Sequence, residues 1–338
     1  MARLSMILLV LTYVAVMAWT LAAILFQTHG DVSRWALICG EAMVAAFIVM
    51  AIRKNLCLGW CMLLATIAAI AVIWSTVLPQ EDLEWAPDVM RNVTAQIDGN
   101  KAVIHNIRAF DWLTEDEAVP HWKDGVYPLD GIVAVDLFTS VWGSPAIAHI
   151  LVSFGFLDGR HLVFSAETRR EANEPYSSVG GFFKAFELVL IAAEENDIIK
   201  LRTNSRGEDV SMFPLKLGPE QARALFISYL ERGNGLSQTP EFYNTISANC
   251  TTVVFRLARL LDPGLPIDWR ILASGYLPSY LHDLGALKTD MSLEAVLSAA
   301  RITSHARAVP GGVEYSAWIR TRQVNPAAER RTRNPGSE

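Results

Sequence analysis

The stretch "ISANCTTVVFRLARLL", residues 246–261, contains a cysteine at the position where a helix is expected to begin. Asn249 is a preferred N-cap residue, and the apolar residues after it recur on one helical face. The Cys250 thiol then lies at the helix N-terminus, where partial positive charge favours the thiolate. The chain has 4 cysteines, and the other three lie in strongly apolar segments near the N-terminus. Cys250 is therefore the candidate nucleophile, and a buried, inert cysteine is the alternative.

Three apolar segments, residues 5–27, 35–52 and 56–78, precede the polar part of the 338-residue chain. Each is close to the roughly 20 residues that a helix needs to cross a bilayer. The second contains one charged residue, Glu41, which is costly in lipid and is expected to face a neighbouring helix. The first is too long for a signal peptide and is not followed by an A-x-A cleavage site. Residues 1–78 are therefore predicted to form three transmembrane helices.

Basic residues indicate how these helices are oriented. Arg3 precedes the first segment, and Arg53 and Lys54 lie between the second and the third. The positive-inside rule places these residues in the cytoplasm. Three crossings then put the chain after residue 78 in the periplasm of a Gram-negative cell, whereas two crossings would leave it in the cytoplasm. We predict a protein of the bacterial inner membrane with a periplasmic domain.

The polar region is large enough for one domain and is acidic. Its 25 basic and 33 acidic residues give a net charge of −8, which argues against nucleic acid as a partner. The sequence contains no C-x-x-C zinc pair and no Gly-rich phosphate loop, so we predict neither a metal site nor a cofactor. Residues 79–99 are acidic and contain prolines, which is typical of a linker.

Strand patterns follow this linker, and helices come after them. Residues 101–110 alternate and predict a strand, and residues 131–142 fit a strand or a buried helix. The next strand candidates are "AHILVSFGF", "HLVFSAE", "AFELVLIAAEE", "DIIKLRTN" and "VSMFPLKL". Residues 218–234 and the cysteine segment predict helices, and residues 267–303 predict mixed helix and loop. This order indicates an α+β domain at 100–305, followed by a segment at 306–338 that ends in a disordered tail.

A cysteine nucleophile needs a base, and His149 is the first candidate. It opens a strand between apolar neighbours, so its imidazole is expected to point into a lined cleft. A third group should orient the imidazole. His161 is one candidate for that role, although it lies close to a turn.

The hairpin after the histidine strand supplies the other candidate. "LDG", residues 157–159, is a turn signal between two strand patterns. A three-residue loop pairs Phe156 with Arg160 and places Glu167 opposite His149, whereas a two-residue loop places Thr168 there. We take Glu167 as the candidate orienting group.

Four separated strings occur in a recognisable order. They are "AHILVSFGFLDGRHLVFSAETRRE", "IIKLRTNSRGEDVSMFPLKL", "PEFYNTISANCTT" and "IDWRILASGY". They resemble a family of bacterial envelope proteins that includes the N-terminal periplasmic domain of the Lnb-type lipoprotein N-acyltransferases. The resemblance covers about residues 100–305 and leaves the three apolar segments outside.

This resemblance implies a fold and a site. The implied fold is a circularly permuted papain-like cysteine hydrolase or acyltransferase domain, similar to lecithin–retinol acyltransferases and cell-wall endopeptidases. By the same resemblance, Cys250 of "NCTT" is the nucleophile and His149 of "AHILVSF" is the base. Further candidates for substrate binding or support are Asn249, Tyr176, Tyr243 and Arg202.

Two activities fit such a site. In the first, Cys250 takes an acyl chain from a phospholipid and transfers it to an amine, such as a lipoprotein N-terminus. In the second, the same residues cleave an amide in peptidoglycan or protein. A degenerate domain that only binds is the third possibility. Because the membrane segments favour acyl transfer, we expect a membrane-anchored thiol acyltransferase with a phospholipid donor and an amine acceptor.

Overall fold

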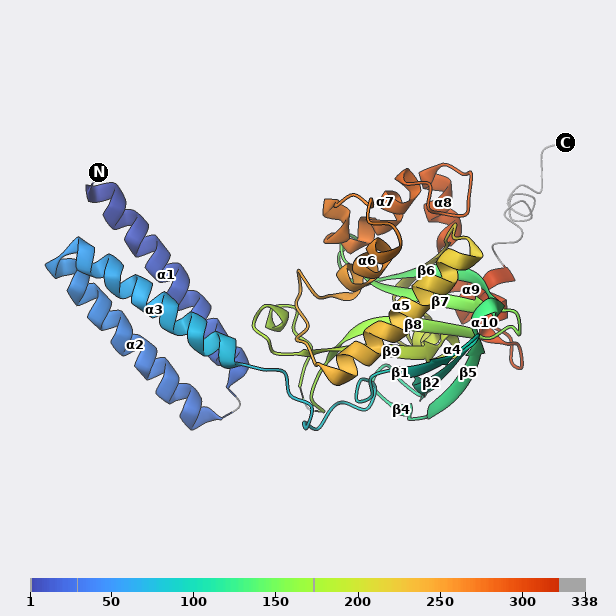
Figure 1. The fold of residues 1–338 in the computed structure, drawn as a ribbon, viewed down its shortest axis with the longest axis horizontal. Helices are drawn as coiled ribbons and strands as arrows, with labels where there is room; N and C mark the ends of the chain where they lie inside the picture. The colour runs from blue at the N-terminus through green and yellow to red at the C-terminus, as the bar shows by residue number, and fades with distance from the viewer. Residues whose placement is uncertain (1, 29, 173, 322–338) are drawn as a thin grey trace. The chain divides into compact units, whose positions relative to one another are not determined.

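The computed structural model describes residues 2–28, 30–172 and 174–321. These residues form two compact units (Figure 1). The first contains the chain up to Leu83 together with the loops Pro175–Glu187 and Phe242–Thr245, and the second contains the remaining described residues. Each unit is described by itself below.

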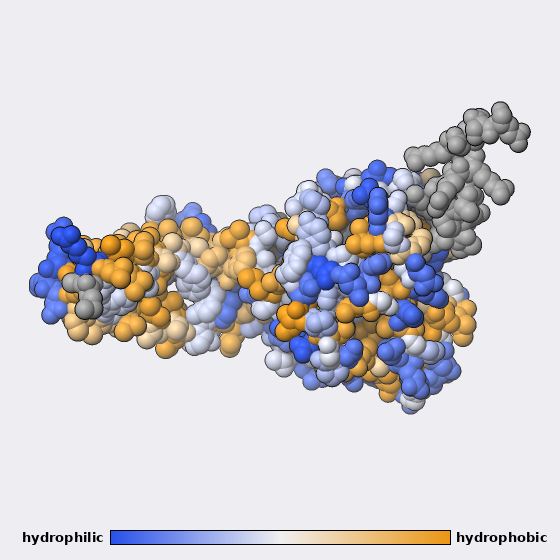
Figure 2. Space-filling model, turned by 90° about the horizontal axis from the view of Figure 1, so that it is seen from above, coloured by the Kyte–Doolittle hydropathy of each residue, from blue (hydrophilic) through white to orange (hydrophobic). Residues whose placement is uncertain are grey.

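Three long helices make up most of the first unit. They are α1 (Ala2–Gln27), α2 (Asp31–Lys54) and α3 (Leu56–Thr76). Each is long and apolar enough to cross a membrane, which confirms the three apolar helices predicted from the sequence. Hydrophobic residues cover most of their visible surface (Figure 2). Within the described chain, Oε1 of Glu41 is buried without a hydrogen-bond partner, as expected for a side chain facing its neighbours.

A mixed β-sheet forms the centre of the second unit. Its strands are β1 (Thr94–Asp98), β2 (Lys101–Arg108), β5 (Trp122–Pro128), β6 (Ile132–Val141), β7 (Ala148–Phe156), β8 (His161–Arg169), β9 (Glu187–Glu194) and β10 (Asp209–Pro214). The spatial order is β1-β2-β9-β8-β7-β6-β10, and β5 also pairs with β2. The β2–β9 pair is parallel, whereas the β6–β7 and β7–β8 pairs are antiparallel. A small ribbon of β3 (Asp111–Trp112) and β4 (Ala118–Val119) lies outside this sheet.

Helices follow most of the strands in the chain, as the α+β prediction requires. They are α4 (Glu195–Lys200), α5 (Pro219–Gln238), α6 (Cys250–Leu261), α7 (Leu277–Asp283), α8 (Leu293–Ala300), α9 (Thr303–Arg307) and α10 (Tyr315–Thr321). Short 3-10 turns occur at Leu129–Gly131, Gly180–Phe182, Trp269–Ile271 and Ser274–Tyr276, and a π-helical segment, η3, spans Leu201–Ser205. The α+β class is confirmed by these elements.

Both faces of the sheet are covered, because successive strand residues point in opposite directions. On one face, Leu151 and Val163 join a core with Ile198 and Ile199 of α4. On the other face, Phe154 and Phe164 pack against aromatic residues of α5, with ring centroids 4.9–5.8 Å apart. Burial of large apolar side chains on both faces fixes the strand register, since a one-residue slip would exchange the faces.

The strand predicted for "DIIKLRTN" is wrong, since these residues form α4 and η3. Ile198 and Ile199 favour a strand by propensity, but the carboxylate of Asp197 holds the helix start. It accepts hydrogen bonds from Arg108 at 2.8 and 3.0 Å and from the indole of Trp112 at 2.7 Å. These long-range contacts cannot be seen in a local pattern.

Two other segments differ from what their composition suggested. Residues 94–98, inside the predicted linker, form β1 and pair with β2. Arg320, assigned to the polar tail, lies in α10 and donates hydrogen bonds to Glu195 and Asp136 at 2.7 Å. Its partners are buried carboxylates, which explains why this arginine is not solvated. The rest of the predicted disordered tail, residues 322–338, lies outside the described residues.

Candidate active site

The N-terminus of α6 positions the cysteine. Asn249 is the N-cap: its side chain accepts a hydrogen bond from the Thr252 N–H, and the Thr252 hydroxyl accepts one from the Asn249 N–H, both at 2.8 Å. This capping box satisfies helix-end groups that otherwise lack partners. Cys250 is the first helical residue and is partly buried. Its Sγ lies 4.0 Å from the carbonyl oxygen of Ala148, at the start of β7.

The β7–β8 hairpin positions the histidine. Phe156 and Arg160 close a three-residue loop, and Gly159 has the positive φ of 85° that such a loop needs. Gly155 pairs with His161 and Leu151 with Ser165. The register predicted from a three-residue loop is therefore confirmed, and the alternative that places Thr168 opposite His149 is excluded.

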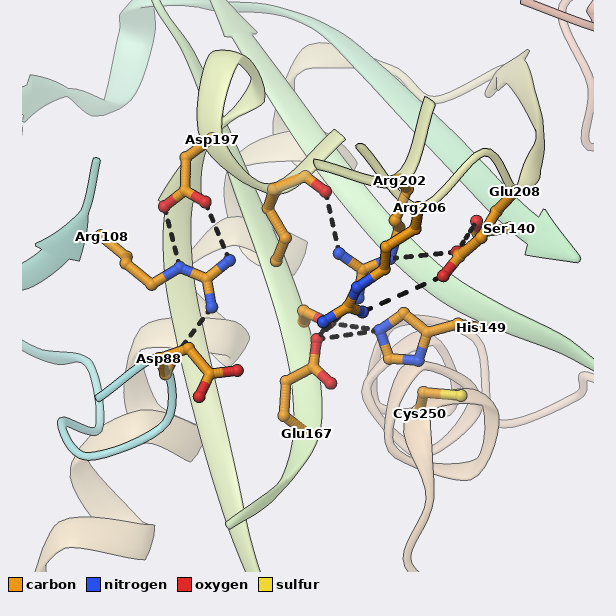
Figure 3. Close-up of polar contacts among 12 residues, drawn as sticks. Asp88, Arg108, Ser140, His149, Glu167, Asp197, Arg202, Arg206, Glu208 and Cys250 are labelled. Carbon is orange, nitrogen blue, oxygen red and sulfur yellow. Dashed lines mark hydrogen bonds and ion pairs between the residues drawn. The ribbon is translucent and has the colours of Figure 1, made fainter. Parts of the chain in front are cut away.

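Two side chains of β8 contact the imidazole of His149. Its Nε2 lies 2.6 Å from Ser165 Oγ and 3.1 Å from Glu167 Oε1. The Ser165 hydroxyl also donates to Glu167 Oε1 at 2.7 Å. Figure 3 shows the imidazole between Glu167 and Cys250, with its second ring nitrogen on the cysteine side. The carboxylate thus orients the ring toward the thiol.

A buried arginine holds the carboxylate in turn. Arg202 Nη2 donates to Glu167 Oε1 at 3.0 Å, and Arg202 Nη1 donates to the carbonyl of Ile198 at 2.8 Å. The Arg202 side chain is 5% exposed. It lies in η3, and such π-helical turns are frequent at functional sites. Arg202 therefore acts on the histidine through Glu167.

A further group of polar residues lies next to His149 and Arg202. Ser140 of β6 is the cross-strand partner of His149 and donates a hydrogen bond to Glu208. Glu208 lies 4.0 Å from both Arg202 and Arg206. These polar groups, gathered from β6, η3 and the loop before β10, are drawn together in Figure 3. Each carboxylate in the cluster has an arginine nearby, as burial of charge requires.

Electrostatics favour a charged thiolate and imidazolium. Burial opposes the imidazolium of His149, but the Glu167 carboxylate and the Cys250 thiolate outweigh it and raise the His149 pKa to about 9. Burial also opposes the thiolate, but the charge and hydrogen bonding of His149 lower the Cys250 pKa below its ordinary value. The pKa of Glu167 is held well below its usual range against burial by His149 and Arg202. Such opposed pKa values are typical of a nucleophile and its base.

The remaining candidates from the sequence have other contacts. Tyr176 and Tyr243 belong to the first unit, where Tyr176 stacks on Phe186 and the Tyr243 N–H donates to the Phe186 carbonyl. His161 contacts the carbonyl of Gly159 at 3.0 Å, not the ring of His149. The described residues contain no group of three or more His, Cys, Asp or Glu able to hold a metal ion.

Sequence reasoning missed Ser165 and Ser140 as members of the site. Once His149 is placed on β7, the residues opposite and diagonal to it on β6 and β8 become its neighbours. Register alone would therefore have pointed to both serines. Glu208 and Arg206 carried no comparable local signal, because η3 and the loop after it bring them to the site.

The Cys250 thiol is expected to react with iodoacetamide much faster at pH 7 than an ordinary thiol. Its rate should fall as the pH drops through the lowered Cys250 pKa, because protonation removes the thiolate. The imidazolium persists up to about pH 9 and is lost above it. Alkylation rates measured between about pH 5 and pH 10 test this profile, and a His149→Gln variant should move the midpoint toward about 8.5. Labelling only after denaturation would instead identify a packed, inert cysteine.

Comparison with known proteins gives one family. Residues 118–275 match the family model described as the Lnb N-terminal periplasmic domain. The matched segment includes His149, Glu167, Arg202 and Cys250, and it confirms the resemblance found in the sequence. No curated protein and no solved structure matches the chain. Together with the three apolar helices, the family description indicates a membrane-anchored chain with a periplasmic domain.

Proposed function

We propose that the chain is a cysteine-dependent acyltransferase of the bacterial inner membrane, with its site in the periplasm. It takes an acyl chain from a phospholipid and transfers it to an amine, such as a lipoprotein N-terminus. The observation that carries this proposal is the arrangement of Cys250, His149 and Glu167, in which a thiol of lowered pKa adjoins an imidazole of raised pKa.

The first half-reaction transfers the acyl group to sulfur. The Cys250 thiolate attacks the ester carbonyl carbon of the phospholipid, and the ester C–O bond breaks. His149 gives its proton to the departing oxygen, which leaves as the hydroxyl of the lysophospholipid. A thioester on Cys250 and a neutral imidazole remain, so atoms and charge balance.

The second half-reaction transfers the acyl group to nitrogen. The acceptor amine attacks the thioester carbon, the C–S bond breaks, and the neutral His149 takes a proton from the amine nitrogen. An amide forms, and the thiolate and imidazolium are restored. The covalent intermediate divides one difficult transfer into two easier steps.

Backbone groups at the start of α6 suit the negative oxygen that forms in both steps. The Thr252 and Val253 N–H groups already donate to Asn249. Within the described part of the chain, the N–H groups of Cys250 and Thr251 have no backbone or side-chain acceptor. Donors at a helix N-terminus stabilise such an oxyanion.

The chain order and the helices support this choice of fold and reaction. The histidine strand precedes the cysteine helix, as expected for a permuted papain-like domain. Three helices that are long and apolar enough to cross a membrane would anchor the chain beside phospholipids, which carry ester-linked acyl chains. An amidase or endopeptidase acting on peptidoglycan or protein would use the same residues, with water in place of the amine.

Intact mass spectrometry tests the proposal. The purified full-length protein, incubated with phospholipid vesicles, is expected to gain one acyl group, and peptide mapping should place it on Cys250. An added peptide with a free N-terminal amine should remove the adduct and become N-acylated. Discharge to water alone would indicate hydrolysis in place of transfer. The absence of an adduct, together with no cleavage of added peptidoglycan or protein, would support a binding domain.

A further inference from the structure

The segment Pro175–Glu187, which leads from β8 to the first residue of β9, belongs to the same compact unit as the three apolar helices. The amide of Gln27, the last residue of α1, donates to the carbonyls of Phe183 and Lys184 at 2.7 and 2.8 Å. The ammonium of Lys184 donates to the carbonyls of Trp74 and Val77 at 2.8 and 2.9 Å. The loop is therefore tied to the C-terminal ends of both α1 and α3.

Lys184 is well suited to the end of α3. The last carbonyls of a helix have no partners within the helix, and the negative end of its dipole attracts a cation. Near lipid these carbonyls cannot rely on water, so a donor from the protein is valuable. Lys184 reaches them with a backbone φ of 55°, which is unusual for a residue other than glycine. The surrounding contacts maintain this strained conformation.

Aromatic side chains reinforce the attachment. Phe183 stacks on Phe26 with ring centroids 5.4 Å apart and lies 5.8 Å from Trp19. The ring centroids of Trp19 and Trp74 are 4.9 Å apart, and Nζ of Lys184 lies 5.0 Å from the ring centroid of Trp74. Tryptophan is enriched where membrane-spanning helices meet the headgroup layer. The contacts of the loop are therefore with the parts of α1 and α3 that reach this layer.

The same loop exposes apolar side chains that nothing in its own unit covers fully. Val179 is 53% exposed and Phe182 is 42% exposed. Both residues lie close in sequence to Phe183 and Lys184, which form hydrogen bonds with the C-terminal ends of α1 and α3. A lipid layer around α1 and α3 would cover these side chains at the place where the helices emerge.

We propose that Pro175–Glu187 is a membrane-interface element, in which Val179 and Phe182 insert among phospholipids while Lys184 and Gln27 fix the loop to α3 and α1. The segment begins six residues after the end of β8, the strand that carries Ser165 and Glu167. The proposal concerns lipid contact and does not depend on turnover by the active site.

The test places an environment-sensitive fluorophore on single cysteines of the full-length chain. Val179→Cys and Phe182→Cys are introduced with Cys39, Cys57, Cys61 and Cys250 changed to serine, and the protein is reconstituted in vesicles of phosphatidylethanolamine and phosphatidylglycerol. We expect blue-shifted emission that is quenched by phospholipids carrying a nitroxide near the headgroup. Leu157→Cys, 76% exposed at the β7–β8 turn of the second unit, gives the reference signal of an exposed residue that takes no part in the proposed contact.

A second arm examines the attachment. Lys184→Gly removes the ammonium while tolerating the left-handed backbone, and it should reduce quenching at residue 182. Lys184→Arg retains the cation and should preserve the quenching. Probes at residues 179 and 182 that behave like the probe at 157 would overturn the insertion. Full quenching in Lys184→Gly would overturn the role given to Lys184.

Discussion

A Cys250→Ala variant is expected to lose acyl transfer by on the order of 10⁴-fold or more, because the covalent route disappears with the sulfur. His149→Ala should be nearly as severe, since the thiolate and the proton donor act as a unit. The Cys250→Ala/His149→Ala double variant should be no slower than either single variant. Initial rates with a phospholipid donor and a peptide amine acceptor measure all three.

Folding controls separate loss of chemistry from loss of structure. Cys250 lies at a helix start and is only partly buried, so Cys250→Ala should retain the melting curve of the parent. Glu167→Gln should lower the rate but leave measurable activity, because it orients the base and does not react. His161→Gln should leave the rate unchanged, since His161 does not contact His149. Wild-type transfer by Cys250→Ala would rule out covalent catalysis at this residue.

An Arg202→Met variant is expected to lose up to about 3 kcal/mol of unfolding free energy, because the buried Glu167 carboxylate loses one of its two cations and keeps only the imidazolium of His149. Glu167 and Arg202 are 20% and 5% exposed, so solvent screens this pair weakly. The loss of Arg202 should also raise the pKa of Glu167, which Arg202 helps to keep low. The positive charge of Arg202 also lowers the pKa of His149, so its removal should raise the His149 pKa further and leave the imidazolium in place at pH 7.

Arg232→Met provides the matched control. Arg232 pairs with Glu241 at 2.6 Å on the surface of the second unit, where the carboxylate is 42% exposed. Exposed pairs contribute about 1 kcal/mol or less, so this variant should unfold nearly as the parent does. Chemical denaturation in detergent, followed by circular dichroism, compares the two variants. Equal stabilities would show that the Glu167–Arg202 pair contributes no more than a surface pair.

The cysteine helix and the histidine hairpin were predictable because their signals are local. Asn249 before Cys250 marks a helix start, and "LDG" with Gly159 selects a loop whose length determines every cross-strand neighbour. The three apolar helices were predictable for the same reason, since length and composition alone decide them. In each case a few adjacent residues carry the information.

Arg202 was already a supporting candidate, but the fold that brings it to Glu167 was not predictable from local patterns. Ile198 and Ile199 suggest a strand, yet the ion pair between Asp197 and Arg108 joins residues 89 positions apart and helps to fix a helix. That helix leads into η3, which delivers Arg202 and Arg206 to the site. Arg320 likewise occurs in a run of polar residues, and only its partners show that it is part of the core. Contacts between distant segments decide these positions.

The hydrogen-bonded ion pairs of Arg320 with Glu195 and Asp136 have a consequence for export of the chain across the membrane. Arg320 lies 125 and 184 positions after its partners Glu195 and Asp136, so both carboxylates emerge from the ribosome long before it does. Until residue 320 has crossed, two acidic groups destined for the interior have no cation, and a closed core is unfavourable. We therefore expect the core of the domain to close only after α10 (Tyr315–Thr321) has crossed the membrane.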